Sequence, residues 1–401
     1  MQKMVQFDEL DKKEQKKKKI NKKKLIISTV IIAIILILLI LVVAYSSSKP
    51  FRKWMDQYIF RKNVSQEKLA SISLEYDSNV NVIAYNRYIC VLAESMLRQY
   101  NTSGELASEI KLEISNPVYS VNNKYLAISE KNSSKVYLVS DSKILWQKEV
   151  DGKVSKIDVN KNGYVSVILT GTTYKSVILT FDNKGNELFK TYRSSTTAMD
   201  ATISNDNKYL GFAEIDTTGT LIQSNIKIIS IEKAKESPSD SIIYTYNAPS
   251  NCLVSNIDYK NKNKLVCNFD DGIRTIQDNQ DEMIMSFEEE DKKINAADIQ
   301  LNNCVYRAIE KTTGLFKADT VIEIMNVDNK KETVYTIEGV AKKIYSYENI
   351  IAINLGQEID FINTSGWLIK NYSSSQDIQD IIIGNNLAGI VYRDKVEIIN
   401  L

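Results

Sequence analysis

The residue types that most often carry protein chemistry are unevenly represented in this sequence. Its 401 residues include no histidine, which excludes serine–histidine and cysteine–histidine catalysis and histidine-ligated metal centres. Aspartate and glutamate are numerous, at 50 residues, but no pair stands out as a general acid and base. We therefore predict no catalytic residue, no metal site and no cofactor, and we expect a protein that is not an enzyme.

One stretch resembles the start of a calcium-binding loop. Asp158, Asn160, Asn162 and Gly163 fit the first half of that pattern, but the twelfth position, where a bidentate glutamate is needed, is Leu169. The alternative is a hairpin turn at Asn-Gly between two strands, and this is the interpretation that we favour.

The four cysteines contain no Cys-x-x-Cys pair. Cys90, Cys267 and Cys304 lie inside apolar, strand-like runs, so we favour buried thiols. A disulfide between Cys252 and Cys267 is the alternative, because these two residues could face each other across one hairpin.

Three long loops share a Thr-Thr pair and a glycine. They are residues 170–176, 216–224 and 311–320, and each joins the second and third strands of a predicted four-stranded unit. Binding residues are often carried by long loops on a rigid scaffold. We predict a partner-binding rim made of Thr172, Thr173, Tyr174, Thr217, Thr218, Leu221, Thr312, Thr313, Leu315 and Phe316. The alternative is loops without a selected role.

The segments that must position these loops are short strands. From Leu69 onward, apolar runs of five to eight residues are separated by Asn, Asp, Lys and Gly, a pattern typical of strands and hairpins. The runs repeat in groups of four at a spacing of about 40 residues. Such a repeat predicts an all-β β-propeller, in which adjacent blades bury a shared core.

The last repeat supplies only three strands. An unpaired strand at Leu69–Tyr76 precedes the first repeat, and we expect it to complete the last blade beside Lys395–Leu401. The prediction is eight four-stranded blades, with seven as the alternative.

A long apolar segment precedes the strands. Leu25–Tyr45 contains 21 residues and no charge, and about 20 helical residues cross a bilayer core. The 24 residues before it hold ten lysines and four acidic residues, and lysines next to a span stay in the cytoplasm. We predict a single transmembrane helix with a cytoplasmic N-terminus; a cleaved signal peptide is the alternative.

Aromatic and basic residues follow this segment. Phe51, Arg52, Lys53, Trp54 and Tyr58 suit the headgroup zone of a membrane. The predicted organisation is a lysine-rich cytoplasmic tail at 1–24, a transmembrane helix at 25–45, a juxtamembrane stalk at 46–68 and an extracytoplasmic propeller at 69–401.

The anchor, the stalk and units such as YNTSGEL (100–106), DNKGNEL (182–188) and SNDNKYLGFAE (204–214) resemble a known family. It is the membrane-anchored, quinoprotein-like or WD40-like β-propeller family of unknown function found in Gram-positive bacteria. The resemblance implies an extracytoplasmic propeller and supplies no catalytic residues. Quinoprotein dehydrogenases carry a tryptophan motif in most blades, whereas only Trp146 and Trp367 lie in these repeats.

We therefore expect a non-enzymatic, protein-binding scaffold in the bacterial cell envelope. Its expected partners are the lipid bilayer and another envelope protein, and not nucleic acid. The alternative is a propeller that binds cell-wall glycan or senses a ligand, and two close carboxylates or stacked aromatic rings at the central axis would favour it.

Overall fold

The structure is a computed structural model that describes residues 22–47, 51, 54–55, 59, 69–74, 80–288, 293–314 and 317–401. The contacts divide the chain into two compact units, Met1–Val64 and Ser65–Leu401.

The first unit contains one long helix, α1 (Lys22–Ser47). Its large apolar side chains between Val30 and Val43 each expose more than a third of their surface. In the part of the chain that is described, no helix reaches the length and apolar character needed to cross a membrane. The rings of Phe51 and Trp54 stack with centroids 5.7 Å apart, whereas Arg52, Lys53 and Tyr58 lie outside the described residues.

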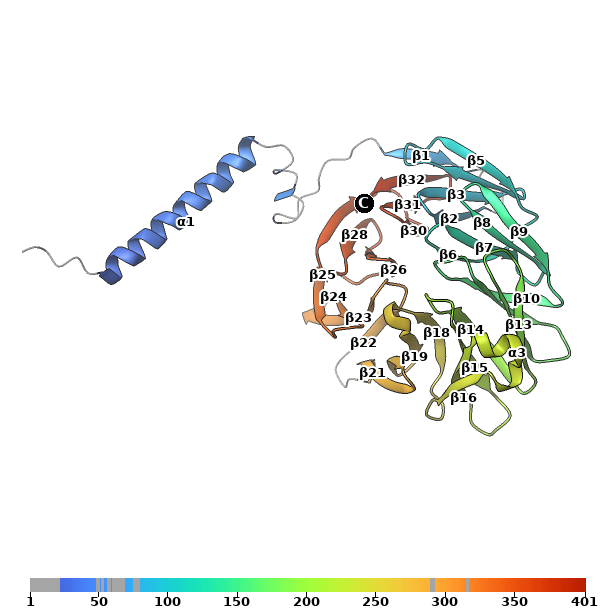
Figure 1. Cartoon of the computed structure of the whole chain (residues 1–401). Helices are drawn as coiled ribbons and strands as arrows, with labels where there is room; N and C mark the ends of the chain where they lie inside the picture. Colours follow the sequence, from blue (N-terminus) through green and yellow to red (C-terminus); the bar gives the residue numbers. More distant parts are fainter. Residues whose placement is uncertain are drawn as a thin grey trace, which may run out of the picture. The chain divides into compact units, whose positions relative to one another are not determined.

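The second unit consists of eight four-stranded antiparallel sheets arranged around a ring (Figure 1). Blade 1 contains β2 (Asn81–Tyr85), β3 (Tyr88–Ala93), β4 (Met96–Tyr100) and β5 (Leu106–Lys111). Blade 2 contains β6 (Pro117–Asn122), β7 (Tyr125–Glu130), β8 (Lys135–Ser140) and β9 (Lys143–Glu149). Blade 3 contains β10 (Lys153–Val159), β11 (Val165–Thr170), β12 (Ser176–Phe181) and β13 (Glu187–Arg193). Blade 4 contains β14 (Thr196–Ile203), β15 (Tyr209–Asp216), β16 (Gln223–Ser230) and β17 (Ile242–Asn247), with the short helices α3 (Ile231–Glu236) and η1 (Pro238–Asp240) before β17.

The remaining four blades complete the ring. Blade 5 contains β18 (Val254–Tyr259), β19 (Leu265–Phe269), β20 (Gly272–Gln277) and β21 (Gln280–Ser286), with η2 (Asn261–Asn263) after β18. Blade 6 contains β22 (Lys293–Asp298), β23 (Cys304–Gly314), β24 (Lys317–Asn326) and β25 (Glu332–Glu338). Blade 7 contains β26 (Lys343–Tyr347), β27 (Ile350–Asn354), β28 (Glu358–Asn363) and β29 (Leu368–Ser373). Blade 8 contains β30 (Asp380–Gly384), β31 (Leu387–Val391), β32 (Lys395–Asn400) and β1 (Ala70–Ser73).

The ring closes through β1, the first strand in the sequence. Ala70 pairs with Ile398 and Ser73 with Lys395, in antiparallel register. The predictions of eight blades and of closure beside the last strand are both confirmed.

The blades are held together by apolar side chains. Eight clusters of buried residues are present among the described residues, and each joins two successive blades. At the closure, Val396 and Ile398 of β32 pack with Ile89 and Val91 of β3. Each fully buried Ile or Val side chain contributes about 1.5–3 kcal/mol, so the interfaces between blades are the main source of stability.

Tight turns connect the strands where the sequence predicts them. In blade 3, the Gly163 amide donates to the Asn160 carbonyl at 3.0 Å. Gly163 has φ of 81°, and a Cβ there would lie 2.8 Å from the Tyr125 ring, so only glycine fits without a shift. The hairpin interpretation of this stretch is therefore confirmed.

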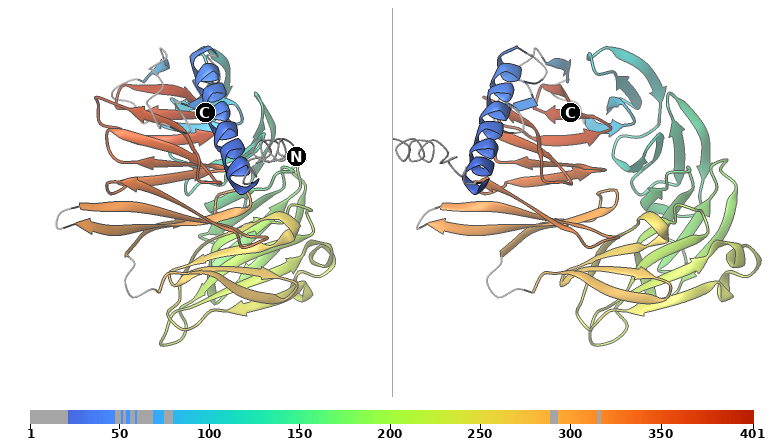
Figure 2. Two further views of the ribbon diagram at one scale, coloured as in Figure 1. Left: turned by 90° about the vertical axis from the view of Figure 1, so that its left-hand side faces the viewer. Right: turned by 60° about the vertical axis from the view of Figure 1, so that its left-hand side comes forward.

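The strand order assigns each connection to one of two faces of the disc. Connections from second to third strands, and from one blade to the next, lie on one face, which we call the loop face. Connections from first to second and from third to fourth strands lie on the opposite face, which we call the turn face. The hairpin of β23 and β24, coloured orange, extends past its neighbouring strands (Figure 2).

Candidate functional site

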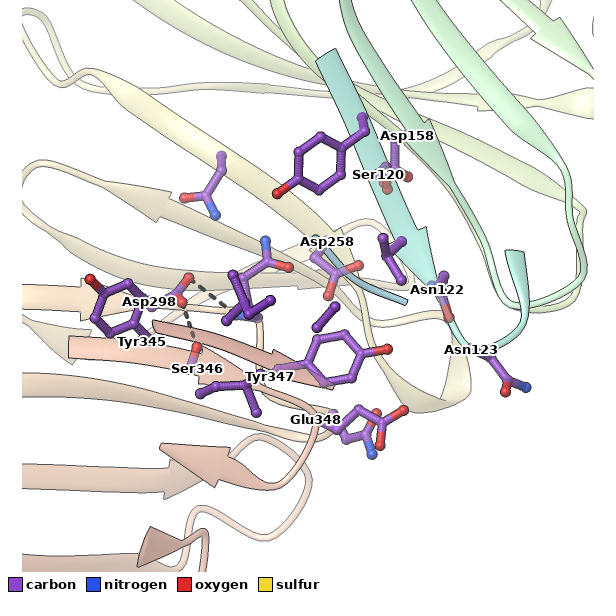
Figure 3. A pocket seen from close by; sticks show the side chains of 18 of the residues that line it. Ser120, Asn122, Asn123, Asp158, Asp258, Asp298, Tyr345, Ser346, Tyr347 and Glu348 are labelled. Atoms are coloured by element: carbon purple, nitrogen blue, oxygen red, sulfur yellow. Dashed lines mark hydrogen bonds between the residues drawn. The ribbon is translucent and has the colours of Figure 1, made fainter. Parts of the chain in front are cut away.

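The first strands of all eight blades line a central cavity of about 1060 Å³. Figure 3 shows Asp158, Asp258 and Asp298, from three blades, around the same space as Tyr347 of β26. Ligand pockets in proteins are commonly about 300–1,000 Å³, so the cavity is large enough for a small molecule. The sequence did not predict this cavity.

Carboxylates gather on the half of the cavity wall that belongs to blades 3–6. In each of these blades the pairing of the first two strands contains a β-bulge or similar irregularity. Asp298 is the last residue of the first strand of its blade, and Asp158 and Asp258 are the last but one of theirs. Blade 4 has its irregularity next to Asp200. The four carboxylates thus line one cavity although they are 40 to 60 residues apart along the chain.

Two of these carboxylates are paired with lysines of the same wall. The Lys156 ammonium lies 2.8 Å from Asp200, and Lys260 pairs with Asp258. Asp200 also accepts a hydrogen bond from the backbone amide of Ile257 in blade 5, at 2.9 Å. The wall therefore already holds ammonium groups against its carboxylates.

The other two carboxylates receive hydrogen bonds from uncharged donors. Ser120 of β6 donates to Asp158 at 2.9 Å, and Thr202 also bonds to Asp158. The hydroxyl of Ser346 in β26 donates a hydrogen bond to Asp298 at 2.5 Å, and the backbone amide of Ile299 donates another at 2.7 Å. No lysine or arginine lies within ion-pair distance of either carboxylate in the described ranges.

The proton affinity of the acidic wall follows from this geometry. Burial, together with the negative charges of Asp200 and Asp258, raises the pKa of Asp158 to about 6. Burial also raises the pKa values of Asp200 and Asp298. At Asp200 the nearby Lys156 ammonium partly offsets this rise.

The opposite half of the wall belongs to blades 7, 8, 1 and 2 and is largely apolar or aromatic. Its side chains include Tyr345 and Tyr347 of β26, Tyr119 of β6, and aliphatic residues of β30 and β2, namely Ile381, Ile382, Ile383, Ile83 and Ala84. None of the four blades shows a bulge between its first two strands. This half also carries Glu348 and the ion pair of Lys343 with Asp380, so the cavity has a wall rich in carboxylates facing a wall in which apolar and aromatic side chains predominate.

At the turn face, the cavity is bordered by amide side chains of the first turns of the blades. They are Asn122, Asn123, Asn205, Asn261 and Asn302. Lys161 and Glu348, from the first turns of blades 3 and 7, also border the cavity, so a ligand that enters from this face would meet amides together with one ammonium group and one carboxylate.

The predicted rim loops occupy the predicted connections. Residues 170–176 and 216–224 join second and third strands in blades 3 and 4, so both lie on the loop face. The Lys175 ammonium lies 3.5 Å from the Thr217 hydroxyl, which brings the two loops together. The Thr172 hydroxyl accepts a hydrogen bond from the backbone amide of Tyr174, and the Thr218 hydroxyl donates one to Asp216. Both threonines therefore stabilise the conformation of their own loops. Thr173 is exposed.

Four apolar side chains are exposed on this part of the loop face: Tyr174, Tyr192, Leu221 and Ile222, which we call the rim patch. They expose 38%, 49%, 53% and 43% of their surface. The rings of Tyr174 and Tyr192 pack with centroids 4.7 Å apart. Tyr192 lies in an outer strand outside the predicted loops, and Ile222 lies in the predicted loop 216–224 but was not among its predicted binding residues.

The third predicted loop is different. Thr312 and Thr313 belong to β23, and Thr312 pairs with Ala318 of β24, so residues 311–320 are mostly a hairpin extension and not a long loop. The correction has a simple reason: β-branched Thr and Val continue the strand on both sides. Leu315 and Phe316 lie outside the described residues.

The disulfide between Cys252 and Cys267, the alternative to buried thiols, is absent. All four cysteines are free and buried, so the buried-thiol interpretation is confirmed. Cys267 lies inside β19 and pairs with Ile257, whereas Cys252 precedes β18 and lies beside Asp270 and Asp271. The two thiols are therefore not opposite each other in the hairpin register.

The family comparison places residues 60–401 in a family of unknown function named DUF5711. The chain belongs to the DUF5711 family. No curated protein sequence matches it. The expected resemblance to a propeller family of unknown function is confirmed at this level, and the expected membrane anchor and Gram-positive origin remain predictions.

The DUF5711 propeller is similar to solved structures of low sequence identity. Sqt1 from Chaetomium thermophilum is 10% identical with a TM-score of 0.53, over 84% of this chain and 98% of that chain. BamB from Moraxella catarrhalis is 12% identical with a TM-score of 0.49, over 84% of this chain and 99% of that chain. The likeness to Sqt1 shows a shared β-propeller fold.

Proposed function

We propose that this DUF5711 protein is a non-enzymatic scaffold of the bacterial cell envelope. Its propeller lies outside the membrane and holds another envelope protein at the loop face. The observation that carries the proposal is the rim patch, where four exposed apolar side chains lie on the adjoining blades 3 and 4.

The rim patch suits protein recognition for physical reasons. Tyr174 and Tyr192 are aromatic residues, which are enriched at the centres of protein interfaces. The loops that carry the patch are tied by Thr172, Thr218 and the contact of Lys175 with Thr217, so little conformational entropy is lost on binding.

The proposed location rests on the sequence before the propeller. Leu25–Tyr45 is uncharged over 21 residues, and the lysines of the preceding tail favour a cytoplasmic N-terminus. Protease added to intact spheroplasts tests it: the propeller should be digested while a tag fused before Met1 stays protected. Extraction of the protein by alkaline carbonate, or protection of the propeller, would contradict the proposal.

The partner is tested by gentle cross-linking and purification of the full-length protein from its own membranes. The wild-type protein and the double variant Tyr174→Ser, Leu221→Ser are compared. The matched control is Leu145→Ser, because Leu145 is similarly exposed, at 48%, on β9 outside the rim patch.

We expect one envelope protein in stoichiometric amount with the wild type and the control, and its loss with the rim variant. Equal capture by all three proteins would contradict the rim, and no captured protein at all would contradict the scaffold function.

The alternative, binding of cell-wall glycan, gains one specific observation. The central cavity combines carboxylates, such as Asp158 and Asp258, with tyrosines, such as Tyr347, and sugars are commonly bound by stacking and hydrogen bonds. Retention of the full-length protein on purified cell wall, with no protein partner, would favour this alternative.

A further inference from the structure

The charges of the central cavity do not balance locally. Among the acidic residues of its lining, Asp200, Asp258 and Asp380 each have a lysine partner, the last being Lys343 at 3.0 Å. Asp158, Asp298 and Glu348 have no such partner within the described residues, and the two aspartates rely on hydroxyl and amide donors. An anion in the cavity would meet these unneutralised carboxylates, so the lining selects against anionic ligands.

A metal ion fits this lining poorly. Among the described residues, three cysteine or carboxylate ligand atoms lie within 4.8 Å of one another only at Cys252, Asp270 and Asp271, which are not cavity residues. That group is already occupied by protein contacts, because the Arg274 guanidinium bonds to both oxygens of Asp271 at 2.6 and 2.7 Å. The carboxylates of the cavity are too dispersed to form a comparable cluster, whereas a larger organic ion needs only one of them.

The geometry of the two walls adds a second requirement. Four of the six acidic residues belong to blades 3–6, whereas most of the apolar and aromatic lining belongs to blades 7, 8, 1 and 2, on the other side of the ring (Figure 1), together with Glu348 and the paired Asp380. Tyr347 and Ile382 therefore lie across the cavity from Asp158. A ligand that pairs with Asp158 and also packs on Tyr347 and Ile382 needs positive charge at one end and apolar surface at the other.

The protein's own lysines show that the wall accepts ammonium groups. Lys156 and Lys260 place their ammonium groups against Asp200 and Asp258. Asp158 lies close enough to both of these carboxylates to feel their charge. A further ammonium group at Asp158 would thus be attracted by three carboxylates and opposed by two lysines.

We propose that the central cavity is a binding site for a small organic amine with an apolar or aromatic body. Its ammonium group pairs with Asp158, and its body packs against Tyr347 and the isoleucines of β30. The site is separate from the rim patch, so the proposal does not depend on partner capture.

The test uses phenethylamine as the probe and 2-phenylethanol as its neutral analogue. Binding to the full-length protein in a non-ionic detergent is measured by isothermal titration and by saturation-transfer NMR at pH 7.5. The variant is Asp158→Asn, and the matched control is Asp151→Asn, because Asp151 is an exposed aspartate outside the cavity. Thermal unfolding of each variant confirms that it is folded.

We expect saturable binding of phenethylamine to the wild type and to the control, and at least tenfold weaker binding to Asp158→Asn. The neutral analogue should bind at least tenfold more weakly than the amine. Absence of saturable amine binding, equal binding of the neutral analogue, or unchanged binding to a folded Asp158→Asn protein would each overturn the proposal.

Discussion

The interface between blades 3 and 4 and the interface between blades 8 and 1 both contain a buried apolar cluster, but the first adds a buried cluster of charges to it. Between blades 3 and 4, the buried Glu214 bonds to Arg193 through two contacts of 2.6 and 3.0 Å, and to Lys227 and Thr196. At the closure of blades 8 and 1, the cluster consists of aliphatic side chains such as Ile72 and Ile398.

The comparison shows what each chemistry contributes to a propeller. An apolar interface is non-directional and tolerates the small adjustments that closing a ring requires. A buried cluster of charges fixes one relative position of two strands but is stable only when every member is present. The cavity shows a related difference, because blades 3 and 4 supply Asp158 and Asp200, whereas blades 8 and 1 supply Ile382 and Ala84 beside the lysine-paired Asp380.

The largest expected effect is a charge at the apolar closure. Ile398 is 2% exposed and pairs with Ala70. Ile398→Asp should lower the free energy of unfolding by about 4 kcal/mol, because a carboxylate is buried there without a partner. Urea unfolding measures the loss. Ile398→Val is the control and should cost about 1 kcal/mol; equal stability of the two variants would mean that the closure is not buried as described.

Removing the charge of Glu214 should have the next largest effect. Glu214→Gln leaves Arg193 and Lys227 without their carboxylate, so we expect a loss of about 3 kcal/mol in the same measurement. Glu310→Gln is the control, since Glu310 pairs with the well-exposed Lys293 at the surface. Similar losses for both substitutions would show that the buried cluster is no more important than a surface pair.

The charge of Asp158 should lower the free energy of unfolding, whereas the charge of Glu214 raises it. Its pKa is raised from the ordinary 3.8 to about 6 in the folded state, so the unfolded chain loses this proton first as the pH rises. Stability therefore falls between about pH 4 and pH 6 and stays reduced above that range. A shift of this size corresponds to at most about 3 kcal/mol, and contact with the solvated cavity should reduce it to about 2 kcal/mol.

We accordingly expect Asp158→Asn to be more stable than the wild type at pH 7.5. The gain in stability should be smaller at pH 4.5, and urea unfolding at both pH values measures it. Asp271→Asn is a control of opposite sign, because hydrogen bonds from Arg274 hold the pKa of Asp271 below its usual range. Loss of stability in Asp158→Asn at pH 7.5 would mean that its hydrogen bonds outweigh its desolvation.

The smallest expected effect concerns a hydroxyl in blade 3. Thr180 is fully buried, and its hydroxyl has no hydrogen-bond partner within the described residues. Thr180→Val should raise the free energy of unfolding by about 1 kcal/mol. Thr196→Val should lower it instead, because Thr196 donates to Glu214 at 2.6 Å. Destabilisation by both substitutions would indicate that Thr180 has a partner after all, such as a buried water molecule.

The sequence was sufficient to predict the propeller for a definite physical reason. Strand and turn signals are local, and eight copies of the same pattern reinforce one another. The closure by residues 70–73 could also be predicted, because the last repeat lacked one strand that only this segment could supply.

The sequence was not sufficient to predict the central site, because its residues come together only through the ring. In the sequence Asp158 stands out only as part of a calcium-loop pattern, whereas its partners Ser120 and Thr202 belong to other blades. An alignment of the first strands would have been informative, since KIDV, NIDY and AADI place Asp158, Asp258 and Asp298 near the same point of each strand. The alternative of a disulfide between Cys252 and Cys267 is excluded for a related reason, because proximity in sequence does not establish strand register.

The pairing of β1 with β32 has a consequence for the order of folding. The contact of Ala70 with Ile398 spans almost the whole propeller, so it forms only after seven other blades have been synthesised. Contacts between residues so distant in sequence form late and slowly. During synthesis the chain must therefore pass through an open arc with two apolar ends, and these ends are the surfaces on which a chaperone or an aggregating neighbour would act first.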